Sequence, residues 1–392
     1  MYKNKKKILF VYYTMMLGGS TTSLLSLLDS LDYEKYDVDL LLYRNEGPYL
    51  HYIPQKVNLL PQACVIDKRK EQVMRGLANG SLLKSITQGI KYSHKIKPIK
   101  QSMAYTQVSF CRKIEKEYDV AIGFLELWSD VFVNNCITSK KKISWIHVDY
   151  EKAHMFPDID RKMFEKSNFI VNVSEECLVN FQRAFPEYAD KSIYIPNILT
   201  KQFLMHRLQG QEKSLNVSRD AINLVSACRI AIDHKGLDRG LAAIKKLIEN
   251  NFKIKWYIIG NGPDYNQLKG LIKDNQLEEY VILMGQMEVP YSVYHNFDAF
   301  FVPSRFEGKP MAVTEAMMLA LPPIVTAYAS AAEQIDNGVD GIIAKNSVEG
   351  IYEALKQICE YPNILKELKI NLENREYDNI NDLERIKAIL DC

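Results

Sequence analysis

The sequence predicts an α/β protein with two domains, each containing a parallel β-sheet covered by α-helices. Short runs rich in β-branched and aromatic residues alternate with helical patterns along the chain, which is typical of repeated strand–helix–strand units. A length of 392 residues is enough for two domains with separate cores. Hydrophobic residues make up 47% and charged residues 25% of the chain, as in an average globular protein.

The alternation separates into two Rossmann-like sets of elements. In the first set a helix at 20–31 follows the first strand, and strands are expected at 8–13, 38–43, 120–124, 142–146, 169–173 and 192–195. In the second set helices are expected at 237–250 and 264–274, with strands at 223–227, 255–259, 281–284, 299–302 and 324–326. Residues 199–221 are polar and lack a strand pattern, so we expect the interdomain linker there.

Cysteine usage and hydropathy predict a cytoplasmic protein that is soluble or peripheral to a membrane. The seven cysteines form no C-x-x-C pair, and an odd number without a secretory signal favours free thiols in a reducing compartment. The apolar run at 8–13 is too short for a signal peptide. No segment approaches the roughly 18 apolar residues of a spanning helix. A net charge of +2 and the lack of a recognition motif argue against a nucleic-acid partner.

The most informative feature is a pair of glutamates, Glu307 and Glu315, separated by seven residues. Pro310 suits the first turn of a helix, and the apolar run at 311–321 predicts that helix. Glu307 is then expected in the preceding loop and Glu315 about one turn into the helix. The free N–H groups at the helix N-terminus, between the two carboxylates, favour a phosphate or another anion. Taken alone, the pair also fits a surface acid before a capped helix.

The wider sequence around this pair carries a resemblance to a known family. Its segments are Phe300-Phe301-Val302-Pro303-Ser304-Arg305-Phe306-Glu307-Gly308, Glu315-Ala316-Met317, Leu321-Pro322-Pro323-Ile324-Val325-Thr326 and Glu333. Together they resemble the donor-site signature of the GT-B retaining glycosyltransferases, group 1 or family 4. The resemblance implies that Glu307 faces the donor sugar, either as a nucleophile or by holding donor hydroxyls, and that Glu315 binds the ribose. It implies that the backbone at Lys309, Pro310 and Met311 holds the diphosphate.

The helix end departs from the family pattern. Ala320 stands where a helix-ending glycine is usual before Pro322. A left-handed alanine would cost about 1 kcal/mol, so we expect this helix to end differently.

The resemblance extends to positions elsewhere in the chain. Arg229 and Lys235 correspond to the basic pair that binds the donor diphosphate, where preorganised cations stabilise the departing phosphate. His147 corresponds to the histidine that contacts the donor sugar, although a lone histidine after a strand is also a common structural residue. Other positions implied in the donor site are Gly18 and Gly19 for the phosphates and Gln286 and Met287 for the base.

The family fold is GT-B, in which two Rossmann-like domains face a central cleft. The resemblance implies an acceptor-binding domain at 1–198 and a nucleotide-sugar donor-binding domain at 199–380. The last helix, expected at 382–390, would lie in a segment 381–392 that crosses back to the first domain.

Two D-x-D motifs raise the question of a divalent metal. Asp37-Val38-Asp39 enters an expected strand, and Asp158-Ile159-Asp160 follows Pro157 in an expected polar turn. Mg²⁺ needs carboxylates beside the substrate phosphates, and neither motif meets that condition. We therefore expect no metal and no other cofactor, with Arg229 and Lys235 balancing the charge of the phosphates instead.

A basic stretch in the first domain is a candidate partner surface. Cations and apolar residues interleave at 84–100, where the lysines are Lys84, Lys91, Lys95, Lys97 and Lys100. Such a stretch fits either an anionic membrane surface or a solvated helical face.

The sequence thus predicts a retaining, metal-independent hexosyltransferase that uses a nucleotide sugar, with a UDP-sugar favoured. Its acceptor is expected to be a hydroxyl of a saccharide, with a lipid-linked acceptor for surface polysaccharide or glycoconjugate synthesis as the candidate. Two alternatives stay open: a nucleotide-sugar 2-epimerase of the same fold, which would release free sugar, and a non-catalytic nucleotide-sugar-binding subunit.

Overall fold

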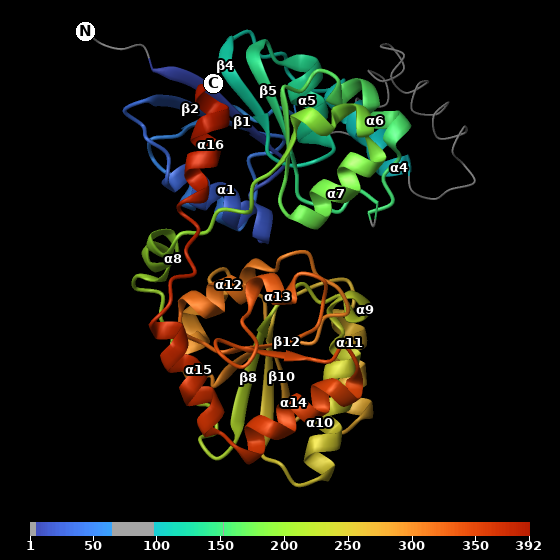
Figure 1. Cartoon of the computed structure of the whole chain (residues 1–392), viewed down its shortest axis with the longest axis vertical. Coiled ribbons are helices and arrows are strands. Elements are labelled where there is room, and N and C mark those ends of the chain that lie inside the picture. The colour runs from blue at the N-terminus through green and yellow to red at the C-terminus, as the bar shows by residue number, and fades with distance from the viewer. Residues whose placement is uncertain (1–4, 65–97, 152) are drawn as a thin grey trace. The chain divides into compact units, whose positions relative to one another are not determined.

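The computed structural model describes residues 5–64, 98–151 and 153–392. The chain divides into two compact units, an N-terminal unit of Met1–Ile198 with Asn379–Cys392 and a C-terminal unit of Leu199–Asp378 (Figure 1). The second division therefore falls after residue 378, where the sequence placed it after residue 380. Most of the basic stretch at 84–100 lies outside the described residues.

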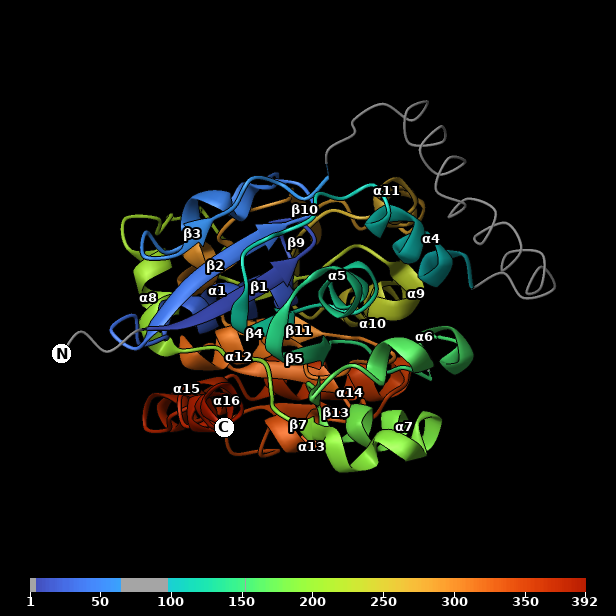
Figure 2. The ribbon, with the colours of Figure 1, turned by 90° about the horizontal axis from the view of Figure 1, so that it is seen from above.

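The N-terminal unit contains a seven-stranded sheet in the order β3-β2-β1-β4-β5-β6-β7, and every neighbouring pair is parallel. Its strands are β1 (Lys6–Tyr12), β2 (Tyr36–Leu42), β3 (Asn58–Leu59), β4 (Tyr118–Gly123), β5 (Ser139–Ile146), β6 (Phe169–Asn172) and β7 (Ser192–Tyr194). Figure 2 shows β3, β2 and β1 side by side. The expected parallel α/β architecture is confirmed, and only the two-residue edge strand β3 was not expected from the sequence.

The central position of β1 explains its composition. Ile8 pairs with Val38 on one side and Val120 on the other, and both faces of the sheet carry helices (Figure 1). A strand buried on both faces needs a continuous apolar run, and residues 8–11 are completely buried. The helices of this unit are α1 (Gly19–Asp29), α4 (Pro98–Val108), α5 (Trp128–Cys136), α6 (Pro157–Phe164), α7 (Glu175–Ala184) and α16 (Asp382–Asp391), with 3₁₀ turns η1 (Pro48–Tyr52) and η2 (Pro186–Lys191).

The final helix, α16, belongs to the N-terminal unit, although the whole C-terminal unit, Leu199–Asp378, lies between it and β7 in the sequence. 

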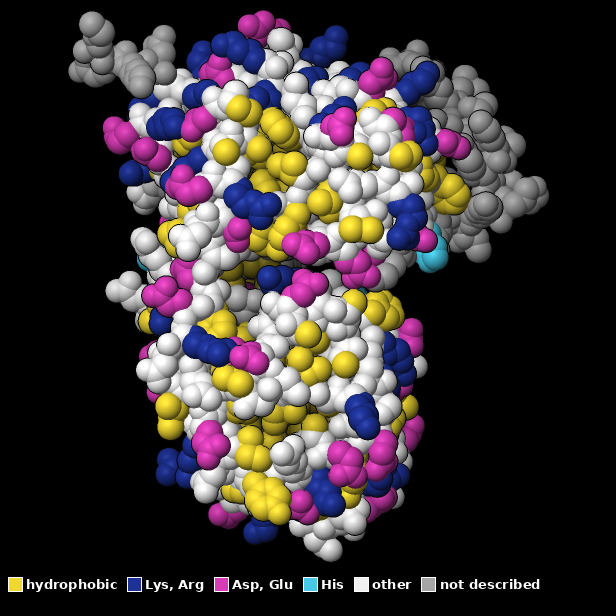
Figure 3. Space-filling model, viewed as in Figure 1, with side chains coloured by type: hydrophobic (Ala, Val, Ile, Leu, Met, Phe, Trp, Pro, Cys, Tyr) yellow, Lys and Arg dark blue, Asp and Glu magenta, His cyan; other side chains and the backbone are white. Residues whose placement is uncertain are grey.

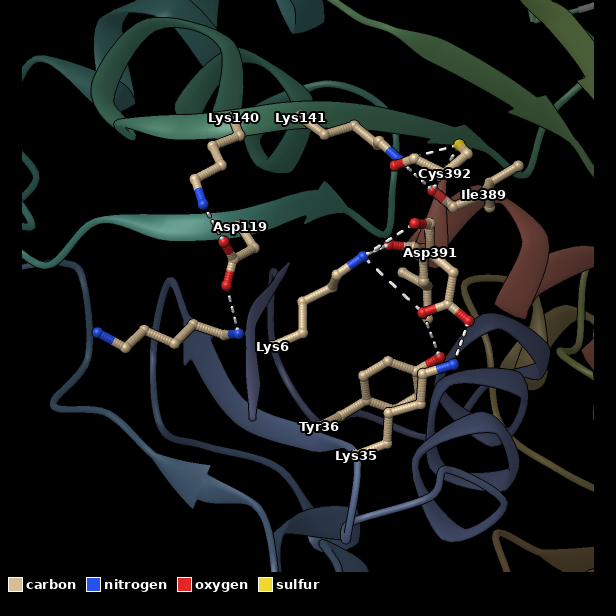
Figure 4. Close-up of polar contacts among 11 residues, drawn as sticks. Lys6, Lys35, Tyr36, Asp119, Lys140, Lys141, Ile389, Asp391 and Cys392 are labelled. Atoms are coloured by element: carbon tan, nitrogen blue, oxygen red, sulfur yellow. Dashed lines mark hydrogen bonds and ion pairs between the residues drawn. The ribbon is translucent and has the colours of Figure 1, made fainter. Parts of the chain in front are cut away.

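The anchor of α16 is a group of polar contacts at the start of β1 and β2 (Figure 4). Lys6 donates from Nζ to the carbonyl of Leu390 at 2.8 Å, and Tyr36 donates from its hydroxyl to the Asp391 carboxylate at 3.0 Å. Lys35 also binds Asp391. Burial opposes ionisation of Asp391, but the hydrogen bonds from Lys35 and Tyr36 outweigh it and lower the pKa of this carboxyl.

The C-terminal unit contains a six-stranded sheet in the order β10-β9-β8-β11-β12-β13, and its neighbouring pairs are again parallel. Its strands are β8 (Ile222–Ala227), β9 (Ile254–Ile259), β10 (Val281–Gly285), β11 (Ala299–Val302), β12 (Pro323–Thr326) and β13 (Ile342–Ala344). Its helices are α8 (Lys201–Leu208), α9 (Ile232–Lys235), α10 (Leu237–Glu249), α11 (Tyr265–Asp274), α12 (Met311–Met318), α13 (Ala331–Gln334), α14 (Val348–Glu360) and α15 (Asn363–Glu373), with the 3₁₀ turn η3 (Pro290–Asn296). The short strand β13 was not expected from the sequence.

The segment expected to be a linker, 199–221, instead belongs to the C-terminal unit and contains α8. Thr200 caps this helix by accepting a hydrogen bond from the Phe203 N–H at 3.2 Å. Phe203, Leu204 and Leu208 are buried, which is the spacing of one helical face. The helix was not expected because the apolar residues of this segment are few and its composition is polar, whereas the domain boundary expected after residue 198 coincides with the division of the chain.

Helix α12 ends at Met318, before the expected residue 321, and the expectation about Ala320 was also wrong. Ala320 adopts the left-handed conformation, with φ of 55°. Its N–H donates to the Met317 carbonyl at 3.0 Å, and the Leu321 N–H donates to the Ala316 carbonyl at 2.9 Å. These two bonds satisfy carbonyls at the helix end, and Leu321 is buried, so the ending usual for glycine is kept despite a strain of about 1 kcal/mol.

The first D-x-D motif is part of the packing of β2. Asp39 is buried and accepts hydrogen bonds from the Tyr118 hydroxyl at 2.6 Å, Lys116 Nζ at 2.9 Å and Asn58 Nδ2 at 2.9 Å. These three donors occupy the carboxylate and tie β2 to its neighbours.

The second motif lies in helix α6 and not in the expected turn. Asp160 is buried and accepts hydrogen bonds from Gln101 at 2.6 Å, Tyr150 at 2.9 Å and Tyr105 at 3.2 Å. Burial raises the pKa of Asp160 to about 6, against these hydrogen bonds. Across residues 5–64, 98–151 and 153–392, no three His, Cys, Asp or Glu side chains are grouped as metal ligands would be.

The described surface mixes charges of both signs. On the face drawn in Figure 3, Lys and Arg side chains are interspersed with Asp and Glu side chains over both units. Within the described part of the chain, no helix has the length and apolar character needed to cross a bilayer.

Candidate functional site

The candidate residues of the C-terminal unit lie in loops at one edge of its sheet. Arg229 follows β8, Gln286 follows β10, and Glu307 follows β11. Because all these strands are parallel, their carboxyl ends lie at the same edge, where α/β proteins commonly bind ligands.

Glu307 is the centre of a polar cluster in this unit. Its Oε1 atom accepts hydrogen bonds from Lys235 Nζ at 2.6 Å and from Ser304 Oγ at 2.7 Å. Nε2 of His234 lies 4.0 Å from Oε2. The Glu307 side chain is only 8% exposed and that of Lys235 18% exposed, so this ion pair is shielded from solvent. The structure thus brings together two residues that are 72 positions apart in the sequence.

Two loops are fastened together to make this contact. Arg305 donates from its backbone N–H to the His234 carbonyl at 3.0 Å, and its guanidinium binds both carboxylate oxygens of Asp238, at 2.8 and 2.6 Å. Gly236 has φ of +60°, and an added Cβ would lie 2.0 Å from the Pro303 carbonyl oxygen. Only glycine allows this approach, so Gly236 fixes Lys235 beside the loop that carries Glu307.

The cluster carries further positive charge at its exposed side. Arg229 is exposed. Partial burial, together with the charges of Lys235 and Arg229, lowers the pKa of His234 against the opposing effect of Glu307. The His234 ring is therefore neutral at physiological pH, and it stacks on Phe306 with ring centroids 4.5 Å apart. Arg229 and Lys235 are the cations available to an anionic ligand here.

Helix α12 begins directly after this loop. Pro310 is its N-cap residue and Met311 its first residue, while Lys309 is exposed just before them. Gln334 holds this end in place by donating from Nε2 to the Pro310 carbonyl at 3.0 Å and to Thr314 Oγ1 at 2.7 Å. The first N–H groups of α12 have no partner inside the helix, as at any helix N-terminus.

Glu315 lies inside α12 and is buried. Burial raises the pKa of its carboxyl to about 7, and the positive charge of Arg207 opposes that rise. Arg207 comes from α8 and was not among the residues that the sequence indicated.

The loop after β10 holds Gln286, which is exposed, and Met287, which is half-buried. Gly285 begins this loop with φ of +72°, a conformation that favours glycine, and its carbonyl accepts the Gly260 N–H at 2.8 Å. This hydrogen bond joins the loop that follows β9 to the loop that holds the base-binding candidates, at the same edge of the sheet.

In the N-terminal unit, Gly18 and Gly19 form the start of α1. Gly18 has an extended backbone, and a Cβ added to it would meet no atom within 4 Å. The fold itself therefore does not require glycine at this position. The hydroxyl of Tyr12, at the end of β1, shares a hydrogen bond of 2.8 Å with Ser20 Oγ, in which either oxygen can be the donor. This bond fixes the first turn of the helix.

His147 follows β5 in the same unit. Burial lowers the pKa of its imidazole to about 3, so the ring is neutral at physiological pH. Its backbone N–H donates to Glu126 Oε2 at 3.0 Å, and its ring packs against Phe124 with centroids 5.1 Å apart. Leu127, next to Glu126, has φ of 70°, a strained value for leucine that costs about 1–3 kcal/mol.

The structure therefore shows two groups of candidates, one in each unit. The structure adds three residues that the sequence did not indicate as candidates, Glu126, Arg207 and Ser304. Glu126 had a signal that could have been used, because it is an acid two residues after the expected strand at 120–124. Arg207 had none, since Glu288, Tyr291 and Glu315 lie far away from it in the sequence.

Comparisons with known proteins identify similar sequences and similar folds. Residues 212–375 match the family model described as glycosyl transferases group 1. Over 99% of this chain and 96% of the relative, the sequence is 22% identical to UDP-Gal:alpha-D-GlcNAc-diphosphoundecaprenol alpha-1,3-galactosyltransferase from Escherichia coli.

Solved structures share the whole fold. HepE from Anabaena, crystallised with UDP and glucose, superposes with a TM-score of 0.68 at 15% identity, covering 98% of this chain and 99% of HepE. A TarM variant from S. aureus gives a TM-score of 0.69 at 13% identity, covering 99% of this chain and 100% of TarM. These likenesses show a two-domain GT-B fold, and the match to the family model lies within its C-terminal unit.

The environment of His147 generates a test that does not depend on ligand. Because protonation would place a charge among buried groups, we expect the His147 imidazole to show no titration between pH 5 and 8 in ¹H–¹³C NMR spectra. The spectrum of His147→Gln identifies its resonance, and free imidazole added to the same sample serves as the titrating reference. A His147 pKa above about 6 would contradict the burial described here.

Proposed function

We propose that this protein is a retaining glycosyltransferase that moves a sugar from a nucleotide sugar, most simply a UDP-sugar, to a hydroxyl of a saccharide acceptor. The observation that carries the proposal is the hydrogen bond of 2.6 Å between Lys235 Nζ and Glu307 Oε1. Glu307 lies in the loop just before α12, and Glu315 lies inside that helix. A cation for phosphate, a carboxylate for the sugar and a carboxylate for the ribose are thereby available in one unit.

In this proposal the diphosphate lies against Arg229, Lys235 and the free N–H groups at the start of α12, next to Lys309, Pro310 and Met311. Negative charge grows on the leaving phosphate as the glycosidic bond breaks, and positive charge grows on the anomeric carbon. Fixed cations in a shielded site stabilise the first charge better than water does. Glu307 stabilises the second and holds the donor hydroxyls, while its ion pair with Lys235 keeps it in place.

Retention of configuration follows if the acceptor hydroxyl attacks from the face that the phosphate leaves, with the leaving phosphate oxygen accepting the hydroxyl proton. His147 then contacts the sugar through a neutral imidazole, which can donate one hydrogen bond and accept another. Glu126 holds the backbone of His147. Gly18 and Gly19 let the donor phosphates approach the backbone at the start of α1.

The nucleoside half of the donor is proposed to bind at Glu315, through the ribose hydroxyls, and at Gln286 and Met287, through the base. The E. coli relative is named for UDP-galactose, and the HepE structure contains UDP, which supports a uridine nucleotide. The name of that relative also includes a diphosphoundecaprenol acceptor. We accordingly propose a lipid-linked saccharide acceptor, used on the cytoplasmic side of a membrane in the assembly of a surface polysaccharide or glycoconjugate.

The first test is a panel of UDP- and GDP-sugars in thermal-shift and turnover assays. We expect one UDP-sugar class to raise the unfolding temperature, because a ligand at 100 times its Kd stabilises the folded state by about 2.7 kcal/mol. With a saccharide acceptor present, the sugar should appear in a glycoside with the donor's anomeric configuration. Free epimerised sugar would favour the 2-epimerase, and binding with neither transfer nor donor hydrolysis would favour a non-catalytic subunit.

Substitution of the two glutamates should change different kinetic constants. Glu307→Gln should mainly lower kcat, because the carboxylate acts as charge develops on the sugar in the transition state. Glu315→Gln should mainly raise the donor KM, because ribose contacts are equally strong in ground and transition states. A loss of about 3 kcal/mol at Glu307 corresponds to roughly a hundredfold in kcat.

Steady-state kinetics of both variants, with unfolding curves to check their folding, decides between these roles. Glu367→Gln is a matched control, since Glu367 is exposed on α15, a helix that holds no candidate residue of the site. A Glu307→Gln enzyme with kcat near that of the wild type would remove Glu307 from the reaction.

Transfer is also proposed to need no divalent metal, since Arg229 and Lys235 balance the diphosphate charge. Activity after treatment with a chelator should equal that of the untreated enzyme at saturating donor. Lys235→Gln should lose at least tenfold in kcat/KM, and added Mg²⁺ should not restore it. An absolute requirement for Mg²⁺ or Mn²⁺ at saturating donor would contradict this assignment.

A further inference from the structure

Arg207 is a cation in an unusual place. It lies on α8, in the stretch that resembled a linker, and is only 2% exposed. Arginine is almost never fully buried unless other groups compensate its charge, because removing a guanidinium from water is costly. Its neighbours therefore show what it does.

The guanidinium is held by an aromatic pair and a carbonyl. Its central carbon lies 5.6 Å from the ring centroid of Phe203 and 5.8 Å from that of Tyr291, distances typical of cation–π contacts. Its Nη2 atom donates to the backbone carbonyl of Glu288 at 3.3 Å. Glu288 directly follows Gln286 and Met287, so Arg207 is fastened to the loop proposed to bind the base.

The same guanidinium acts on Glu315. Its positive charge opposes the effect of burial, which raises the pKa of that carboxyl to about 7. Glu315 and Glu288 come from different elements, α12 and the segment between β10 and η3. One side chain from a third element, α8, thus contacts the loop of the proposed base site and exerts its charge on the carboxyl of the proposed ribose site.

We propose that Arg207 is a positioning residue of the nucleoside site, which holds the Glu315 carboxylate and the 286–288 loop in the arrangement that binds ribose and base together. This inference rests on the proposed function, because it assumes that a nucleoside diphosphate binds in the C-terminal unit. A purely structural arginine would be replaceable by an apolar side chain of similar volume, since a well-packed apolar group costs no desolvation.

Two variants test the proposal. Arg207→Met keeps much of the apolar packing against Phe203 and Tyr291 but removes the charge and the donor to Glu288. We expect it to fold and to bind UDP at least tenfold more weakly in calorimetry, with donor KM raised and kcat changed less than threefold. Arg207→Lys keeps the charge without the planar fork, so it should recover part of the affinity.

Lys201→Gln, an exposed position on the same helix, is the matched control and should bind UDP like the wild type. Arg207→Met should also cost less affinity in a Glu315→Gln background than in the wild type, because part of its effect passes through that carboxylate.

The outcomes separate the two hypotheses. If the wild type binds no UDP and no other nucleoside diphosphate, the proposed function fails. If the wild type binds UDP and Arg207→Met binds it within twofold, the inference about Arg207 is wrong. A fall in kcat with unchanged KM, or full additivity with Glu315→Gln, would also overturn it. Should Arg207→Met fail to fold, Arg207→Lys and its double variant with Glu315→Gln provide the same comparison.

Discussion

The candidate site of the C-terminal unit depends on the close approach of two loops, one after β8 and one after β11. Gly236 permits that approach, since any side chain there would collide with the Pro303 carbonyl, and the two hydrogen bonds between Arg305 and Asp238 hold it. The result is the buried contact between Lys235 and Glu307. Without this fastening, a lysine and a carboxylate on separate loops in water would gain only about 0–1 kcal/mol from pairing.

The sheet supplies the second condition. In both units every strand runs parallel to its neighbours, so the loops that follow the strands collect at one edge. In the N-terminal unit this edge carries Gly18, Glu126 and His147, and a strained Leu127 lies beside Glu126. Strain of this kind persists only where surrounding packing enforces it, and it is common at functional sites.

Local patterns predicted much of this architecture. Apolar runs bounded by turns located eleven of the strands, because strands buried on both faces must be continuously apolar. The strands that were missed, β3 and β13, have only two and three residues and depend on pairing with a neighbour. At Ala320 the reasoning from propensity was wrong, since two hydrogen bonds and the burial of Leu321 outweigh the cost of a left-handed alanine.

The amino-acid sequence by itself determined the class of fold, the resemblance to a glycosyltransferase family and most of the candidate residues, because strand patterns, turns and short motifs are local properties of the chain. Only the tertiary structure decided which of those residues meet. It brought Lys235 to Glu307, joined Arg207 to the Glu288 carbonyl, set the charge of Arg207 against the burial of Glu315, and gave the D-x-D aspartates their structural partners. Contacts of this kind join residues far apart in the chain, and burial and charge at each depend on neighbours that no local pattern specifies.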